Sequence, residues 1–144
     1  MDCEINIQLI PNAEITAIIP LLRLLNNVIP EQTLRDRLDD MVRQGYKCAG
    51  LYLGGELIGI CGLWIITKYY VGRHIEPDNV VILPEHRAKG FGKQLISWVC
   101  EYGRSQGCIA SELNCYITNE SGQAFWEKEG YNKIGYHYQR RLEP

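Results

Sequence analysis

A basic loop containing two glycines follows an apolar run in residues 80–93. Arg87, Lys89 and Lys93 supply positive charge, and Gly90 and Gly92 lie between them. Glycine lets successive backbone N–H groups converge on an anion, and the N-terminus of a following helix adds partial positive charge. The loop therefore predicts a pyrophosphate site, with contacts from Arg87, Ala88, Lys89, Gly90, Phe91, Gly92 and Lys93.

The spacing of this loop distinguishes it from two better-known phosphate motifs, G-x-x-x-x-G-K-[ST] and G-x-G-x-x-G. Arg87-x-x-Gly90-x-Gly92 resembles the R/Q-x-x-G-x-G/A loop with which the GNAT superfamily of N-acetyltransferases binds acetyl-CoA. The resemblance implies acetyl-CoA as co-substrate and main-chain contacts to its pantetheine arm from Val80, Val81 and Ile82, with the Val81 N–H at the thioester. An ordinary glycine-rich turn is the alternative.

A second segment, residues 119–131, resembles the family pattern N-x-x-A-x-x-hydrophobic-Y-x-x-x-G-F. Asn119, Gly130 and Tyr131 match it, whereas Trp126 stands where the family has tyrosine. The resemblance implies that Asn119 contacts pantetheine and that the family's tyrosine lies near the sulfur as a candidate general acid. We expect Trp126, in its place, to shape the pantetheine channel. An indole N–H does not protonate a departing thiolate. Asn119 as a helix cap and Trp126 as a core aromatic are the structural alternatives.

Acetyl transfer to a primary amine requires a base, because the amine has a pKa near 10.4. Asp78 is the preferred base, His74 is its competitor, and Glu76 and Asn79 are further candidates. Each could instead be a solvated residue at a strand end. Unassisted or water-assisted departure of the thiolate, whose pKa is near 8.5, is the expected route. Tyr116, Tyr136 and Tyr138 are the available alternatives as an acid.

Cys115 could support an acyl-enzyme route, because a thiol is a competent nucleophile. No adjacent base is identifiable for it. Direct transfer in a ternary complex is therefore the expected reaction.

Composition limits the class of protein. The 144 residues predict one domain over residues 1–144, and the net charge of −2 argues against a nucleic-acid partner. Apolar runs are too short to span a membrane, and residues 1–4 lack the basic region of a signal peptide, so a cytoplasmic protein is expected. The six cysteines, Cys3 included, show no zinc-ligand spacing, which predicts free thiols and no metal.

Hydrophobic periodicity predicts the elements that must position these residues. Asn12 is expected to cap a helix that Pro20 kinks or splits, and Gly54-Gly55 indicates a hairpin. Strands are predicted at 4–10, 46–53, 56–67, 73–83, 109–117 and 131–142, and helices from Asn12, after Pro30, from Phe91 to Gly107 and from Asn119 to Gly130.

This order, β-α-α-β-β-β-α-β-α-β, resembles the GNAT fold over nearly the whole chain. The resemblance implies an α/β (α+β) protein with a central mixed, mostly antiparallel sheet of about six strands flanked by about four helices. It also implies an N-acetyltransferase. A non-catalytic acyl-CoA-binding or regulatory module and a scaffold with an incidental glycine turn are the alternatives.

The sequence leaves the acceptor amine open between a small molecule and a peptide, and it leaves open a homodimer. Acidic residues on the second predicted helix could attract a cationic acceptor or simply solvate that helix. They are Glu31, Asp36, Asp39 and Asp40.

Overall fold

The computed structural model describes residues 4–144 and divides into two compact units, residues 1–112 and 113–144, which are described separately. The expectations that involve residues 1–3, among them the free thiol of Cys3, lie outside the described residues. None of the helices in residues 4–144 is both long enough and apolar enough to cross a membrane.

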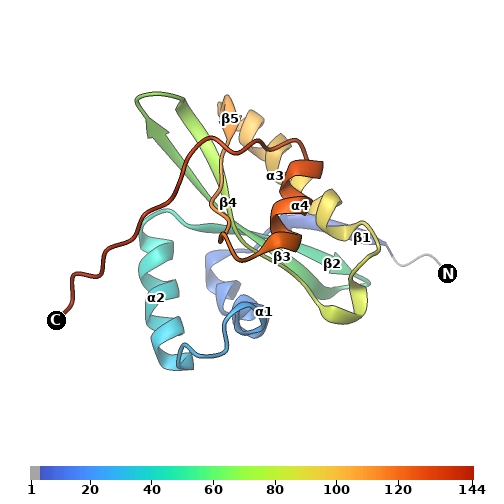
Figure 1. Ribbon diagram of the computed structural model, residues 1–144. Helices are drawn as coiled ribbons and strands as arrows, with labels where there is room; N and C mark the ends of the chain where they lie inside the picture. Colours follow the sequence, from blue (N-terminus) through green and yellow to red (C-terminus); the bar gives the residue numbers. More distant parts are fainter. Residues whose placement is uncertain (1–3) are drawn as a thin grey trace. The chain divides into compact units, whose positions relative to one another are not determined.

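Unit 1 is built on a five-stranded sheet in the order β1-β2-β3-β4-β5 (Figure 1). Neighbouring strands are antiparallel except for β4 and β5, which are parallel. The strands are β1 (Ile5–Leu9), β2 (Lys47–Leu53), β3 (Glu56–Lys68), β4 (Gly72–Ile82) and β5 (Ala110–Ser111). Gly54 and Gly55 join β2 to β3 with φ of 56° and 85°, values that a type I′ hairpin turn requires. The predicted hairpin is confirmed.

Two helices and a 3-10 segment cover one face of this sheet. The first predicted helix is split, as expected from Pro20, into η1 (Asn12–Ile18) and α1 (Ile19–Leu25). Asn12 does not cap it, because Pro11 occupies the N-cap position and no side chain bonds the free N–H groups. α2 (Glu31–Arg43) follows Pro30 as predicted. Their apolar faces form a core with β2, β3 and β4 through Ile10, Ile15, Ile18, Ile19, Leu21, Leu22, Leu38, Tyr46, Cys48, Ile60 and Val81.

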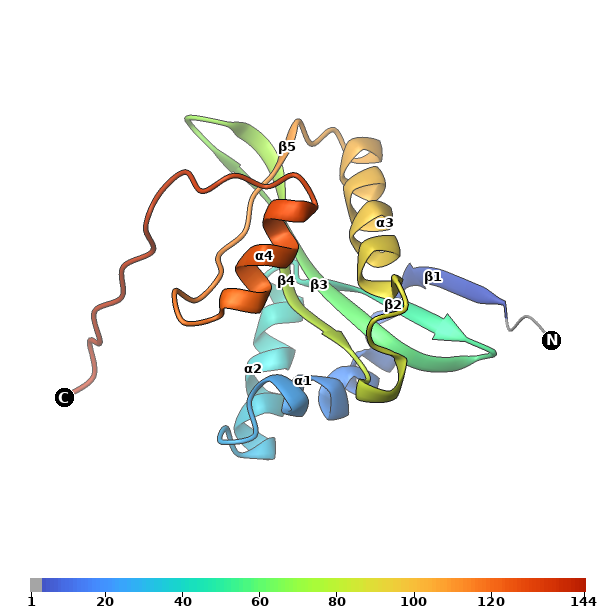
Figure 2. The same ribbon diagram turned by 45° about the vertical axis from the view of Figure 1, so that its right-hand side comes forward.

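α3 (Phe91–Ser105) packs on the opposite face, as the two views of the sheet show (Figure 2). Leu95, Ile96 and Val99 are buried along its inner side. Gly103 brings the helix close to β4, since a Cβ there would lie 2.8 Å from Cγ2 of Ile75. Gly107, at φ 82°, follows the end of the helix as predicted.

The last two predicted strands differ from the structure. The strand expected at 109–117 is limited to Ala110–Ser111, and residues 131–142 form no strand. Unit 2 contains no other described strand with which residues 131–142 could pair, and a strand alone has no ladder. Its one helix is α4 (Glu120–Lys128). The predicted fold class is confirmed, with five strands in place of about six.

Gly103→Ala should destabilise the protein, because the new methyl group would overlap Ile75 between α3 and β4. We expect a loss of about 1–3 kcal/mol in the free energy of unfolding, measured by urea denaturation. Ser97→Ala is the matched control on the exposed side of the same helix and should change stability by less than about 0.5 kcal/mol. Equal stability of both variants would contradict the close packing of α3 on β4.

Candidate functional site

A β-bulge interrupts β4 at the predicted base residues. Val80 lies opposite Cys61 and Asp78 lies opposite Gly62, so Asn79 is an extra residue with no partner on β3. Its φ is 55°, in the left-handed region that asparagine tolerates better than most residues.

Two aromatic side chains hold the bulge. The Tyr46 hydroxyl donates to Oδ1 of Asn79 at 3.2 Å, and the Trp64 Nε1–H donates to Oδ2 of Asp78 at 3.0 Å. The two rings pack against each other with centroids 5.2 Å apart. Asn79 and Asp78 are therefore each fixed by one buried or half-buried ring.

Gly62 makes room for this arrangement. A Cβ at this position would lie 2.2 Å from the Tyr46 hydroxyl oxygen, so any side chain there would displace the ring. Tyr46 is almost completely buried. Burial raises the pKa of its hydroxyl well above the ordinary value, so it remains a hydrogen-bond donor.

Past the bulge, the main chain of β4 offers alternate groups to its two edges. The Leu83 N–H donates to the Ile58 oxygen at 2.8 Å, and because successive residues alternate, Val81 also faces β3. Val80 and Ile82 face the other edge, where Arg87 Nε donates to the Ile82 oxygen at 2.9 Å. The predicted thioester donor, the Val81 N–H, thus belongs to the β3 ladder.

The outer edge of β4 has little strand pairing within unit 1. β5 pairs with β4 only at His74 and Ile75. The Glu112 N–H then donates to the Ile75 oxygen at 3.0 Å. The edge at Val80 and Ile82 therefore has no strand partner among the described residues of unit 1.

The predicted pyrophosphate loop connects β4 to α3 through η2 (Pro84–His86). Ala88 and Gly90 have φ of 60° and 82°, and such alternation of backbone conformation turns neighbouring N–H groups toward one side. Gly90 is the N-cap of α3, and no side chain caps the first N–H groups of the helix. This is the backbone arrangement of an anion site.

The charges of this loop are not neutralised by neighbours. Arg87, Lys89 and Lys93 are exposed, and none of them forms an ion pair with another residue in 4–144. An approaching anion would meet these cations together with the free N–H groups of the helix.

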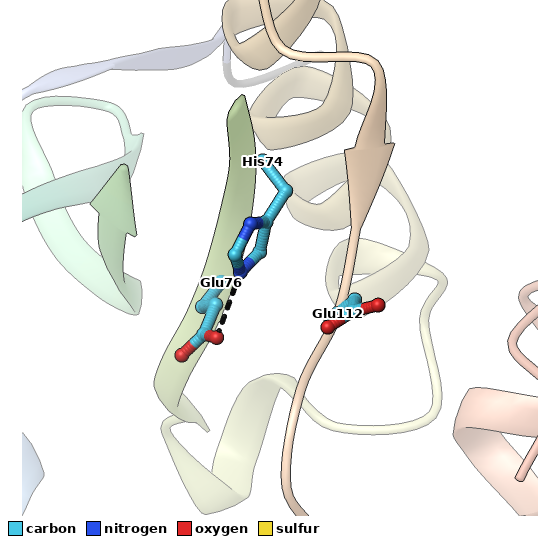
Figure 3. Close-up of side chains that lie close together, drawn as sticks. All are labelled: His74, Glu76 and Glu112. Carbon is cyan, nitrogen blue, oxygen red and sulfur yellow. Dashed lines mark hydrogen bonds and ion pairs between the residues drawn. The ribbon is translucent and has the colours of Figure 1, made fainter. Parts of the chain in front are cut away.

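His74 lies farther back on β4 and is completely buried. Its Nε2 is 2.9 Å from Oε1 of Glu76, and Glu112 lies beside this pair (Figure 3). A side chain with no exposed surface does not touch a substrate. His74 can therefore influence an acceptor only through Glu76, whose side chain is 20% exposed.

The remaining predicted site residues belong to unit 2. Asn119 caps α4, because its side chain accepts the Gly122 N–H at 3.0 Å. Trp126 is half-buried and packs between the rings of Phe125 and Tyr131. Tyr116 is 82% exposed and lies outside any strand, unlike the prediction, because β5 ends at Ser111.

The buried thiols of unit 1 are unsuited to nucleophilic catalysis. Burial raises the pKa of Cys48 to about 12 and that of Cys61 well above its ordinary value. A thiol reacts as the thiolate, so both remain inert near neutral pH. Cys48, Cys61, Cys108 and Cys115 are free thiols.

The comparison with protein families shows to which family the chain belongs. A profile of the acetyltransferase (GNAT) family matches residues 17–131. The chain belongs to this family. GNAT membership confirms the predicted enzyme class, a GNAT-type N-acetyltransferase.

Named relatives of this GNAT protein acetylate amines. It is 29% identical to the aminoalkylphosphonate N-acetyltransferase of Salmonella typhimurium over 125 residues, which cover 83% of this chain and 79% of the relative. It is 37% identical to the glucosamine 6-phosphate N-acetyltransferase of Trypanosoma brucei brucei over 81 residues, which cover 54% of this chain and about half, 52%, of the relative.

Solved GNAT structures share the fold. An aminoglycoside N-acetyltransferase in complex with CoA matches with a TM-score of 0.85 at 17% identity, covering 100% of this chain and 98% of that one. The glucosamine-6-phosphate N-acetyltransferase from Arabidopsis thaliana matches with a TM-score of 0.72 at 18% identity, covering 97% and 99%.

Sequence reasoning missed Tyr46 and Glu112 as parts of this site, because Tyr46 reads only as the start of a strand. For Trp64 the sequence leaves two interpretations open, a residue lining the acceptor pocket and a partly buried sheet aromatic. The available signal was Gly62, since a glycine inside a strand often marks a close approach by another group.

The bulge predicts a backbone effect at Asn79. Asn79→Gly and Asn79→Ala both lose the bond from Tyr46, but only alanine is strained at a positive φ. We therefore expect Asn79→Ala to be less stable than Asn79→Gly by about 1 kcal/mol, measured by urea denaturation. Alanine and glycine variants of equal stability would show that the bulge is not as described.

Proposed function

We propose that this protein transfers the acetyl group of acetyl-CoA to a primary amine by direct attack within a ternary complex. The observation that carries the proposal is the junction of β4, the loop of residues 87–93 and the uncapped N-terminus of α3. The junction offers main-chain donors and unpaired cations to an anion at one end, and a carboxylate on the same strand. Acetyl-CoA is the co-substrate.

The pyrophosphate would lie against residues 87–93, and the pantetheine arm would follow residues 80–82 toward the bulge. Ile82 lies opposite Gly59 and Asp78 lies opposite Gly62. At a rise of about 3.3 Å per residue along β3, the two are therefore separated by about 10 Å. Val80 and Ile82 would supply the main-chain contacts, with Val81 packed beneath them. Asn119 and Trp126, both in unit 2, are further proposed pantetheine contacts. This proposal rests on their positions in the family pattern.

Asp78 is the proposed base, directly or through a water. Trp64 holds one of its oxygens, which fixes the carboxylate and leaves the other oxygen to face the acceptor. Asn79 positions Asp78 through the bulge. Unassisted or water-assisted departure of the thiolate is the proposed route, because its pKa near 8.5 makes it a tolerable leaving group. Tyr116 acting as the acid is the rival.

A small-molecule amine is the proposed acceptor. The named relatives act on an aminoalkylphosphonate and on glucosamine 6-phosphate, and both are small amines. The test is to mix the protein with acetyl-CoA and a panel of small amines and N-terminal peptides, and to follow release of the CoA thiol. Thiol release with a small amine supports the proposal, and release only with peptides contradicts the acceptor class.

The second candidate is a non-catalytic acyl-CoA-binding module. It is favoured by Trp126, which stands where the family pattern has tyrosine. Tight CoA binding without thiol release for any acceptor would support this candidate over the enzyme.

The domain organisation, the location and the partners of this protein are also matters of proposal. We propose that both units form one acetyltransferase domain, because the family profile extends across both. We propose a cytoplasmic location, because Cys48, Cys61, Cys108 and Cys115 are free thiols and disulfides are rare in the cytosol. Partners other than acetyl-CoA and the amine, including nucleic acid or a membrane, are not expected, and a homodimer stays a prediction.

The loop geometry predicts the effect of Gly90 on CoA affinity. Gly90→Val should weaken CoA binding at least about tenfold, because a β-branched residue is strained at φ 82° and would redirect the N–H groups. Gly90→Asn is the matched control, since asparagine tolerates this conformation. Isothermal titration with CoA measures both, and added salt should weaken binding in each. Unchanged affinity in the valine variant would contradict the assignment of the loop.

We expect Asp78→Asn to change turnover without changing CoA affinity. The amide oxygen can still accept the Trp64 N–H, so the local structure is preserved. Turnover at pH 7 should fall by roughly 10²–10⁴ and recover in part as pH approaches the pKa of the acceptor amine. A rate profile across pH identical to that of the unsubstituted protein would eliminate Asp78 as the base.

A further inference from the structure

Three potential metal ligands converge at the edge of the sheet, on β4 and just past β5. His74, Glu76 and Glu112 each offer one ligand atom, and these atoms all lie within 4.8 Å of one another. Figure 3 shows the histidine ring and the Glu76 carboxylate facing each other, with the Glu112 carboxylate at their side. The acetyl-transfer proposal assigns no role to Glu112 and gives Glu76 no direct one.

The orientation of His74 directs its Nε2 into this cluster. Its Nδ1 lies 3.1 Å from the Gly72 carbonyl oxygen. A carbonyl does not donate, so Nδ1 must carry the proton in that bond. A neutral imidazole has one N–H, and Nε2 then presents its lone pair to Oε1 of Glu76 at 2.9 Å. Two acceptors in contact require a positive charge between them, which is either a second proton or a metal ion.

Outer contacts fix the three ligands as metal sites require. A ligating histidine commonly donates its other N–H to a backbone carbonyl, as His74 does to Gly72. The Tyr70 hydroxyl donates to Glu112. The backbone bond from Glu112 to Ile75 fixes the third ligand against β4.

The dimensions suit a small divalent ion. Metal–ligand distances of about 2.0–2.2 Å place two ligand atoms at most about 4.4 Å apart. The spread of 4.8 Å therefore needs only a small rotation of a glutamate side chain. Lys68 Nζ lies 3.6 Å from Oε1 of Glu76. Its side chain is 47% exposed, so it can withdraw into solvent when a cation enters.

We propose that His74, Glu76 and Glu112 bind one first-row divalent cation, of the class of Mn²⁺ or Zn²⁺. One imidazole nitrogen with two carboxylate oxygens suits both ions. Three protein ligands leave positions for water or for an anionic group. The two carboxylates and one neutral imidazole give the ligand set two negative charges, which the ion neutralises. This binding does not depend on acetyl transfer.

The test measures metal binding to the full chain after treatment with EDTA and dialysis. Mn²⁺ is the primary probe, because the free cysteine thiols compete for Zn²⁺ but are poor ligands for Mn²⁺. Isothermal titration, together with loss of the free Mn²⁺ signal in electron paramagnetic resonance, should show one ion bound per chain. Failure of the unsubstituted protein to bind Mn²⁺ or Zn²⁺ at millimolar concentration would overturn the proposal and leave a proton between His74 and Glu76.

Variants assign the site. Glu112→Gln keeps an oxygen for the Tyr70 hydroxyl and should weaken Mn²⁺ binding at least about tenfold, as should His74→Gln. Asp78→Asn is the matched control, because it removes a carboxylate from the same strand outside the cluster, and its affinity should stay within about twofold. Circular dichroism verifies folding of each variant. Undiminished Mn²⁺ binding by folded Glu112→Gln would place the ion elsewhere and refute the proposal.

Discussion

The hydrogen bond from the buried Tyr46 hydroxyl to Asn79 is the constraint on which the rest of the site depends. Burial of a hydroxyl without a hydrogen-bond partner costs free energy. Here the partner is Asn79, the bulge residue that pairs with no residue of β3. The extra residue in the bulge reverses the face of the sheet to which the following side chains of β4 point. Asp78 and Val81 are three residues apart and would point to opposite faces of a regular strand, yet Asp78 bonds Trp64 beside the core in which Val81 is buried.

The same bulge determines what the end of β4 offers. Once the ladder resumes, Val81 is committed to β3, and Val80 and Ile82 turn their main-chain groups to the edge that β5 does not reach. Arg87 then joins the loop to this edge through the Ile82 oxygen. The positive φ values of Ala88 and Gly90 lead directly into α3. The strand edge proposed to bind the pantetheine amides is thus followed directly along the chain by the loop proposed to bind the phosphates.

Local signals made much of this predictable from the sequence. Gly54-Gly55 predicts the β2–β3 hairpin, and Asn119 predicts the N-cap of α4. Two glycines among three cations predict the loop of residues 87–93. Long-range contacts were not predictable. No local pattern shows that Tyr46 reaches Asn79 or that Glu112 reaches His74. Alternation in the C-terminal segment suggested a strand, but a strand also needs a neighbour to pair with, and periodicity does not report one.

The most direct test of the account is an amide chemical-shift titration of the ¹⁵N-labelled protein with acetyl-CoA. Because outward N–H groups should bond the cofactor, the largest shifts are expected at Val80, Ile82 and residues 88–93, with a smaller shift at Val81, whose amide is bonded within the sheet. Saturable binding with these amides unmoved, or with the largest shifts in α2 or β1, would contradict an acetyl-CoA site built on β4 and the loop that follows it.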